Sequence, residues 1–440
     1  MIRRSAICLL LASLGFAAPA TGQTPLTLAG AIGRARAQNP DAGVTAAAER
    51  EGAQRVTQAR AGYLPKVDVA ESWQRGNQPV FVFSSLLAQR QFTAADFALG
   101  TLNHPDAVDN FRLAVTVEQP LFDRVARANV AAADVGRAMA TARRDMVHDD
   151  LAVSVTGGYG HVLVAAAARQ AADAAVEAAR ADRELAGNRR DAGVATDADV
   201  LQLDVHVSRA RERQIRAVAD ERIARAQLNQ LMGEPLGEVF TLDRSPTAAV
   251  LDTTDLASLE EEAAKNRPDV KLAALQEQLA GAAQTAARAA FFPQVSVQGG
   301  WEFDGGTWNT RPSSWIVGAV ARLNVFHGFA DKARVAEAGE QRTQRSLERA
   351  KAETAARLDV RMAVARLEAA RAAEEVGRAT ADQARENRRI IRDRYEAGRA
   401  DVVSLLRAAE AVVEAETQQT VAQMAVLTET AALERSLGRR

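Results

Sequence analysis

The sequence predicts a mainly α-helical chain made of two tandem copies of one unit, each with a pair of β-strands and a long helical hairpin. Hydrophobic residues make up 47% of the 440 residues but aromatic residues only 5%, and there are 12 Pro, so the apolar content is largely Ala, Val and Leu. Such a composition favours helices. An internal duplication and four stretches of alternating polar and apolar residues complete the prediction.

The first 20 residues have the pattern of a cleaved secretory signal peptide. Arg3 and Arg4 precede an apolar run, and residues 18–20 read Ala-Pro-Ala, which fits the small-x-small cleavage rule. Residues 1–20 are therefore predicted to be removed on export. The single cysteine, Cys8, lies inside this segment in a poor match to a lipidation motif. The mature chain is thus expected to lack disulfides and thiolate metal sites.

The duplication shows as two stretches of similar sequence at a constant offset. Residues 61–69 (AGYLPKVDV) resemble residues 289–297 (AAFFPQVSV), and a second constant offset relates Ala192-Gly193 to Ala397-Gly398. The two units are predicted at 24–232 and 255–438, with a linker over 233–254. The change of offset places an insertion of 24 residues between Trp73 and Leu121 of the first unit, within a loop predicted over about 74–110.

Four strands are predicted, over about 66–73, 111–119, 294–302 and 314–323. Val67, Val69 and Trp73 alternate with polar residues, with Glu71 as the one polar break on the apolar face. The fourth strand is ambiguous because Ile316 and Val320 interrupt its alternation. The clear strands are about nine residues long, the length with which a tilted strand crosses a bilayer.

Aromatic residues bracket these strands. One group is expected at the helical end of the strands and a second at the far end; they are Tyr63, Phe122, Phe291, Phe292 and Phe326, and Trp73, Phe111, Trp301 and Trp315. Two aromatic girdles are typical of strands that enter headgroup regions on both sides of a membrane. The alternative is an ordinary aromatic cluster in a soluble hairpin.

Each unit then continues into a long helix, predicted over 124–190 and 330–396 and ~100 Å long at 1.5 Å per residue. Gly193 and Gly398 are expected to end these helices. Returning arms over 199–232 and 401–437 carry apolar residues at steps of three and four, as in a coiled coil. Residues 151–168 lack charged side chains but are rich in Ala and Gly, which favours a packed helix over a membrane span.

Four strands are too few to close a barrel, since closed barrels begin near eight strands. An exported chain without a spanning helix crosses a bilayer as a closed barrel, so several copies must complete one wall. Three copies give twelve strands and twelve helical columns.

At this point the ordered, duplicated set of motifs resembles the TolC-type outer-membrane efflux proteins. It is carried by Asn39-Pro40, the aromatic-Leu/Phe-Pro junctions at 63–65 and 291–293, Pro120-Leu121-Phe122, 228–233 and Arg394-Tyr395-Glu396-Ala397-Gly398. The resemblance implies a homotrimer in outer-membrane lipid, with a 12-stranded β-barrel and an α-helical tunnel across the periplasm. It also implies docking on a periplasmic adaptor protein and an inner-membrane pump.

The resemblance further implies that the two helical turns form a periplasmic tip that constricts at rest. The candidate tip residues are Gly193, Asp197, Asp199, Arg394, Tyr395, Gly398 and Asp401. In relatives, acidic residues soon after the second Gly often line the aperture, whereas here Ser404 and Arg407 follow Asp401. Each acidic candidate is equally well explained as a solvated residue of a charged turn.

No enzyme motif, cofactor site or metal-ligand spacing accompanies these features. His148-Asp149-Asp150 could hold a cation, but a solvated helix face is the favoured interpretation. A net charge of −1 gives no general attraction to nucleic acid. The predicted function is an outer-membrane channel-tunnel of a tripartite efflux pump for small molecules or metal ions. The alternatives are the outer-membrane component of type I protein secretion and a periplasmic adaptor, which has one hairpin between small β-domains.

Overall fold

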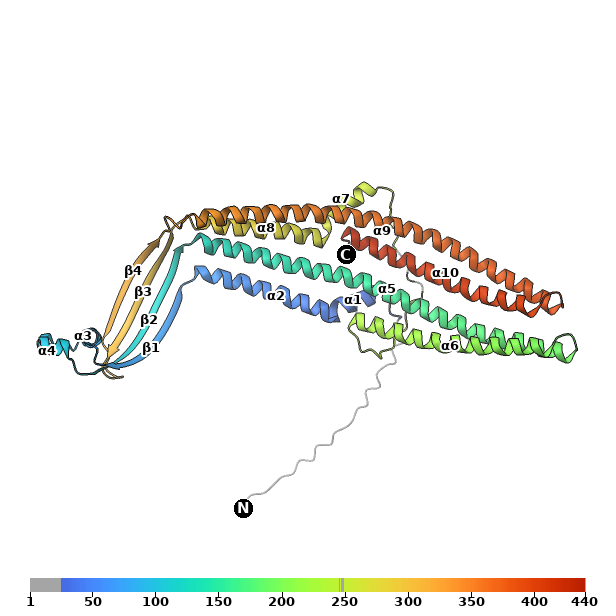
Figure 1. Cartoon of the computed structure of the whole chain (residues 1–440), viewed down its shortest axis with the longest axis horizontal. Helices are drawn as coiled ribbons and strands as arrows, with labels where there is room; N and C mark the ends of the chain where they lie inside the picture. Colours follow the sequence, from blue (N-terminus) through green and yellow to red (C-terminus); the bar gives the residue numbers. More distant parts are fainter. Residues whose placement is uncertain (1–24, 245, 247–248, 440) are drawn as a thin grey trace, which may run out of the picture.

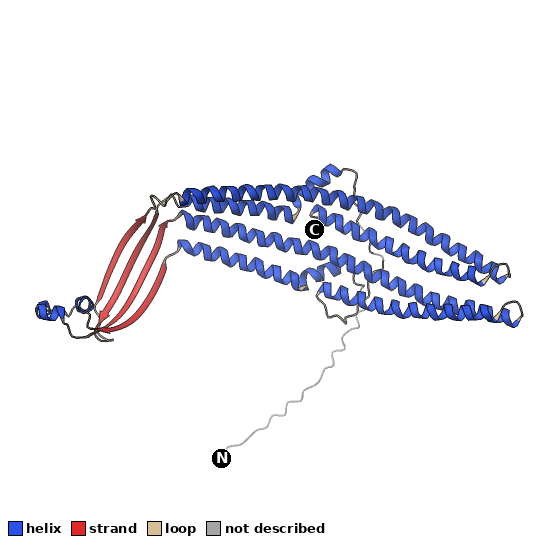
Figure 2. Cartoon of the chain, viewed as in Figure 1, coloured by secondary structure: helices blue, strands red, loops and turns tan. Residues whose placement is uncertain are grey.

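The computed structural model describes residues 25–244, 246 and 249–439, so the predicted signal peptide lies outside the described residues. The chain is elongated, with a β-sheet at one end and paired long helices running to the other (Figures 1 and 2). The elements are α1 (Leu28–Gln38), α2 (Pro40–Arg60), η1 (Ala61–Tyr63), β1 (Lys66–Gly76), α3 (Pro79–Ala88), η2 (Ala94–Phe97), α4 (Leu99–Asn103), β2 (Val108–Phe122), α5 (Arg124–Asp191), α6 (Asp197–Met232), α7 (Leu256–Asn266), α8 (Pro268–Ala289), β3 (Gln294–Gly305), β4 (Ser313–Arg322), α9 (Ala330–Glu396) and α10 (Val402–Leu437).

The same order of elements occurs twice, which confirms the predicted fold class. Two helices separated by a proline lead into a strand pair, and a long helix with a returning arm follows. The predicted long helices agree with α5 and α9, and the returning arms agree with α6 and α10. The Asp123 carboxylate begins α5 by accepting hydrogen bonds from the amides of Val125 and Ala126 at 2.7 and 3.2 Å.

Helix α5 contains a window that is long and apolar enough to cross a membrane, and it is the one such helix in the described part of the chain. In the structure one side of this stretch packs against the rest of the chain. Val155, Tyr159 and Val162 are fully buried against α1, the end of α6 and Leu242. The packed-helix interpretation therefore holds for this segment.

Each half contains one unbroken helix and one column made of two shorter helices. The end of α6 abuts the start of α2, where the Asn39 side chain donates to the Leu231 carbonyl at 2.9 Å. A methyl group at Gly233, whose φ is +75°, would lie 2.5 Å from the Gln38 carbonyl oxygen. The end of α10 meets the α7–α8 junction at Gly438 in the same way. Glycine is required at both joints because only it combines the left-handed backbone with this close approach.

The segment before α1 and the linker after α6 pair with each other and pack on α5. We call this pairing of Leu26 with residues 241–243 the strap. Leu26 pairs with Leu242 in a parallel bridge, and its amide donates to the Thr241 carbonyl at 2.7 Å. The buried Tyr159 hydroxyl lies 2.8 Å from both the Leu26 and the Asp243 carbonyl oxygens. Burial raises the pKa of Tyr159 to about 12, so its hydroxyl keeps its proton for these contacts.

The four predicted strands form one antiparallel sheet in the order β1-β2-β3-β4. They are longer than predicted at several ends: β1 continues to Gly76, β2 begins at Val108, and β3 continues to Gly305. The insertion between β1 and β2 was predicted as a loop, but it folds as α3, η2 and α4 beyond the far end of the sheet (Figure 1). Its residues carry no long helical periodicity because these helices are short.

Candidate functional site

The sheet has two chemically different faces. Paired residues across the strands share a face, so the register assigns each side chain. One face is mostly polar and includes Asp68, Ser72, Asn110, Arg112, Thr116, Glu118, Gln298, Glu302 and Asp304. The other is mostly apolar and includes Val67, Val69, Trp73, Phe111, Leu113, Val115, Val117, Trp301, Trp315 and Val317. Such a sheet is suited to separate water from lipid.

The interruptions of the alternation have specific explanations. Glu71 lies on the apolar face, but the Arg311 guanidinium pairs with both of its carboxylate oxygens at 2.7 and 3.0 Å. Arg311 also lies 4.6 Å from the centre of the Trp308 ring. The charge of Glu71, in the middle of β1, is thus paired with that of Arg311. Ile316 and Val320 fall on the polar face of β4, which explains why the fourth strand was ambiguous.

The first predicted group of aromatic residues lies at the helical end of the strands, whereas the second group is spread along the sheet. Phe111 pairs with Gly305 at the far end of β3, but Trp301 pairs with Val115 in the middle of β2. Trp73 pairs with Phe111, and Trp301 pairs with Trp315, all four on the apolar face. At the helical end, the Arg124 guanidinium lies 3.6 Å from the centre of the Phe292 ring and 6.0 Å from that of Phe122. Tyr63, Phe291 and Phe326 are exposed near these junctions. Their role as membrane-interface residues stays a prediction.

Both edges of the sheet lack a partner strand. Strand β1 pairs on one side with β2, strand β4 pairs on one side with β3, and no other strand of the described chain approaches them. The outward-facing amides and carbonyls of these edges need hydrogen-bond partners wherever water is absent. The sheet of the single chain is therefore open at both edges.

The opposite end of the molecule carries the two helical turns (Figure 1). Gly193 and Gly398 have φ of +73° and +72°, and each ends its helix in the same hydrogen-bond pattern. The Val194 amide donates to the Arg189 carbonyl at 2.9 Å, and the Arg399 amide donates to the Arg394 carbonyl at 2.8 Å. The predicted glycine stops are thus found at both turns.

The acidic tip candidates begin the returning helices. Asp199 forms a capping box with Thr196, whose amide donates to the Asp199 carboxylate at 2.9 Å. The Asp401 carboxylate accepts from the Ser404 amide at 2.7 Å. Hydrogen bonding by the Ser404 side chain, and then by its amide, holds the pKa of Asp401 below its ordinary value. Asp197 is exposed, with Arg190 3.8 Å away. Asp199 and Asp401 therefore have a structural role as caps.

Tyr395 lies in a small apolar core that joins the two hairpins at the tip. The buried members of this core are Ala186, Val200, Leu203, Tyr395, Val402 and Leu405. Burial raises the pKa of the Tyr395 phenol. Arg394 beside it is exposed. Of the predicted tip residues, Tyr395 is thus the one that packs between the hairpins.

Arg189, which the sequence did not single out, connects the same two hairpins. Its guanidinium donates to the carbonyls of Tyr395 and, at 3.3 Å, Glu396, and lies 4.9 Å from the centre of the Tyr395 ring. An α5 side chain thereby satisfies free carbonyls at the end of α9. A basic residue in the last turn of α5 was the only signal in the sequence, and it does not indicate a contact across hairpins.

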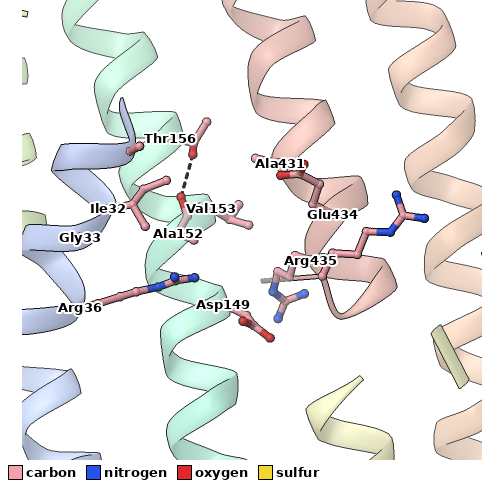
Figure 3. A pocket seen from close by; sticks show the side chains of 12 residues that line it. Ile32, Gly33, Arg36, Asp149, Ala152, Val153, Thr156, Ala431, Glu434 and Arg435 are labelled. Atoms are coloured by element: carbon pink, nitrogen blue, oxygen red, sulfur yellow. Dashed lines mark hydrogen bonds between the residues drawn. The ribbon is translucent and has the colours of Figure 1, made fainter. Parts of the chain in front are cut away.

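A cavity of about 300 Å³ lies midway along the molecule between α1, α5 and α10. Figure 3 shows Arg36 and Asp149 on one side and Glu434 and Arg435 of α10 on the other. Asp149 is buried, so the interpretation of residues 148–150 as a solvated helix face is wrong for Asp149. Asp150 is exposed and accepts from the Arg435 guanidinium at 2.6 Å. Within the described residues no group of three or more His, Cys, Asp or Glu side chains could hold a metal ion.

Comparison with known proteins agrees with this architecture. Protein CyaE of Bordetella pertussis is 33% identical over 315 residues, which is 69% of this chain and 65% of that protein, so the match spans less than two thirds of the relative. The outer membrane protein VceC of Vibrio cholerae superposes with a TM-score of 0.74 at 18% identity, covering 94% of this chain and 96% of that one. The open state of the Neisseria gonorrhoeae MtrE outer membrane channel gives a TM-score of 0.73 at 20% identity, covering 94% and 89%.

The structural matches establish the fold, and the sequence match to a family establishes the relationship. Residues 31–234 and 259–439 match the outer membrane efflux proteins, in two segments that together contain all four strands and both helical hairpins. The two-faced sheet and the paired hairpins described above are the parts that this match covers. The chain therefore belongs to the outer membrane efflux protein family and is a protein of the Gram-negative outer membrane.

Proposed function

We propose that three copies of the chain form a passive export duct through the outer membrane and the periplasm. The observation that carries this proposal is the open, two-faced sheet, which has unpaired edges on β1 and β4. Four strands per copy give a closed 12-stranded barrel from three copies, which is above the minimum near eight strands. Its apolar face contacts lipid and its polar face contacts water.

The helical part continues the same wall. Helices α5 and α9 form unbroken columns, while α2 with α6 and α8 with α10 form the broken ones. Side by side, these four columns per copy make a tube of twelve columns. Helix α5 has 68 residues and is therefore ~100 Å long. A tube of this length reaches far into the periplasm from the barrel.

The duct in this proposal performs no catalytic step and needs no cofactor. Transport energy comes from an inner-membrane pump that connects to the tube through a periplasmic adaptor protein. The exported compounds are small molecules or metal ions. The tip formed by the turns at Gly193 and Gly398, with Asp197, Asp199, Arg394, Tyr395 and Asp401 around them, is the periplasmic aperture.

Reconstitution of the purified protein tests the duct. We expect a trimer in outer-membrane fractions that migrates as monomer after heating, and stepwise conductance in planar bilayers. A purified trimer that never conducts, even when the tip contact of Arg189 is removed by Arg189→Ala, would contradict the proposal. Susceptibility of a deletion strain to toxic compounds and metals, compared with its secreted proteins, separates efflux from type I protein secretion.

A further inference from the structure

The insertion between β1 and β2 is a folded unit fixed to the far end of the sheet. Its rings pack edge to face, with centroids 4.9 Å apart for Phe83 and Phe92 and 5.0 Å apart for Phe92 and Phe97. Thr93 and Asp96 form a capping box that starts η2. Residues 77–107 thus have a small core of their own, so this unit has a defined position.

The anchor of this unit lies on the polar face of the sheet. The buried Gln89 side chain donates to the Asp109 carbonyl at 2.8 Å and to the Asn110 side-chain oxygen at 3.0 Å. The Asn110 amide in turn donates to the Asp304 carboxylate at 3.0 Å. Asn110 and Asp304 belong to the polar face by register. Moving the insertion would leave one of these buried polar groups without a hydrogen-bond partner, which is unfavourable. The network of Gln89, Asn110 and Asp304 therefore fixes the position of the insertion on the sheet.

The unit also reaches across the sheet to its free edge. It leaves the chain between β1 and β2, yet the Arg90 guanidinium donates at 2.9 Å to the carbonyl of Ser313, the first residue of β4. Strand β4 is the edge strand that has no partner on its outer side. Arg90 itself has a φ of +56°, an unusual backbone for a side chain other than glycine. The insertion therefore contacts the β4 edge, which is the edge that a neighbouring copy joins in the proposed trimer.

Several apolar side chains of the insertion remain uncovered in the single chain. Val80, Phe97 and Leu99 are 75%, 65% and 77% exposed, and Leu87 is also exposed. Lipid does not reach them if the polar face lines the pore, because the insertion is anchored on that face. Water contact alone would leave this apolar surface unfavourably exposed. A second copy of the same chain, approaching along the β4 edge, brings an identical surface to the same height.

We propose that the insertions of neighbouring copies pack against one another over the outer mouth of the pore and narrow it. This inference rests on the proposed trimeric duct, because the pore face and the neighbouring copy are part of that assembly. Val80, Phe97 and Leu99 are the contact residues between copies, and Gln89 and Arg90 fix each insertion in place. The outer mouth is thereby a second constriction, separate from the periplasmic tip.

Cysteine cross-linking in the full-length protein tests the contact, since Cys8 in the predicted signal peptide is the only cysteine of the sequence. We expect Phe97→Cys and Val80→Cys, treated in outer-membrane vesicles with a short bis-maleimide, to give covalent dimers on denaturing gels. Val250→Cys, which is 95% exposed far from the insertion, is the control and should stay monomeric.

A release variant tests whether the insertion narrows the pore. Gln89→Ala with Arg90→Gly removes both anchors, and glycine at position 90 keeps the left-handed turn. We expect this variant to lose the Phe97→Cys cross-link and to conduct more in planar bilayers than the parent trimer. A conducting trimer with no cross-link at either position, and with conductance unchanged by the release variant, would overturn this inference alone.

Two other outcomes are equally decisive. Labelling of Phe97→Cys by a membrane-soluble maleimide but not by a water-soluble one would show that lipid covers the insertion, which overturns the inference while leaving the duct intact. Failure of the parent protein to form a trimer or to conduct would overturn the proposed function, and this inference with it.

Discussion

Removal of the Arg189 guanidinium is the sharpest test of how the two hairpins are held at the tip. Arg189→Ala deletes the hydrogen bonds to the carbonyls of Tyr395 and Glu396 and the contact with the Tyr395 ring. A hydrogen bond from a charged donor contributes about 1.5–3 kcal/mol, and a cation–π contact at an exposed site about 0.5–1 kcal/mol. Because the side chain is half-buried, we take the low end, about 2 kcal/mol. That loss shifts an equilibrium between joined and separated hairpins about 30-fold.

Single-channel recording measures this shift directly. Arg189→Ala is expected to raise the conductance, or the open fraction, of the reconstituted trimer at low voltage. Arg190→Ala is the matched control, because Arg190 lies on the same turn but pairs only with the exposed Asp191 and Asp197. Equal behaviour of the two variants would refute the role of Arg189 in joining the hairpins.

Three further predictions concern the helical part and are read out by hydrogen exchange of the assembled protein. Tyr159→Phe removes the hydroxyl that contacts the Leu26 and Asp243 carbonyls, a loss of about 1–2 kcal/mol that should speed exchange of the Asp243 amide, which donates to the Leu26 carbonyl, about 5- to 30-fold; unchanged exchange would contradict it. Gly233→Ala should destabilise the end of α6 more than Gly193→Ala, because both have positive φ but only Gly233 meets the Gln38 backbone; similar effects would remove the steric argument. Burial, with Arg213 next in size and Arg209 adding to it, lowers the pKa of His206 below 6.5, while Glu410 and Asp182 oppose this. Its contribution to stability is therefore complete above pH 6.5 and is lost as the pH falls below it. The protection factors of amides near His206, which compare exchange with the intrinsic rate at the same pH, should fall on acidification, and His206→Gln should remove that pH dependence.

The long elements were predictable because their patterns are local and repeated. The predicted helix over 124–190 differs from α5 by one residue, and the helix over 330–396 coincides with α9. Helical periodicity, a capping residue and a glycine stop are each recognised from a few neighbouring residues of the sequence. The duplication added an independent check, since both halves had to give the same order of elements.

The contacts between distant segments were not predictable in the same way. Arg189 and Tyr395 are joined by packing of two hairpins, and nothing in the sequence near either residue specifies the other. Asp149 is buried because α1 and α10 cover that part of α5, whereas its sequence neighbourhood resembles an exposed face. The helices of the insertion depend on anchors such as Gln89 to Asn110, which are set by the sheet rather than by helical periodicity.

The joints between the shorter helices have a mechanical consequence. At Gly233 the end of α6 meets the start of α2, and at Gly438 the end of α10 meets the start of α8. The two helices of each column are not joined by the chain at this point. We call α6 and α10 the lower arms, and α2 and α8 the upper arms. An arm that swings at the tip can therefore pivot at mid-height, while the upper arms keep their attachment to the strands. In the proposed duct, these joints separate movement of the periplasmic end from the strands that cross the membrane.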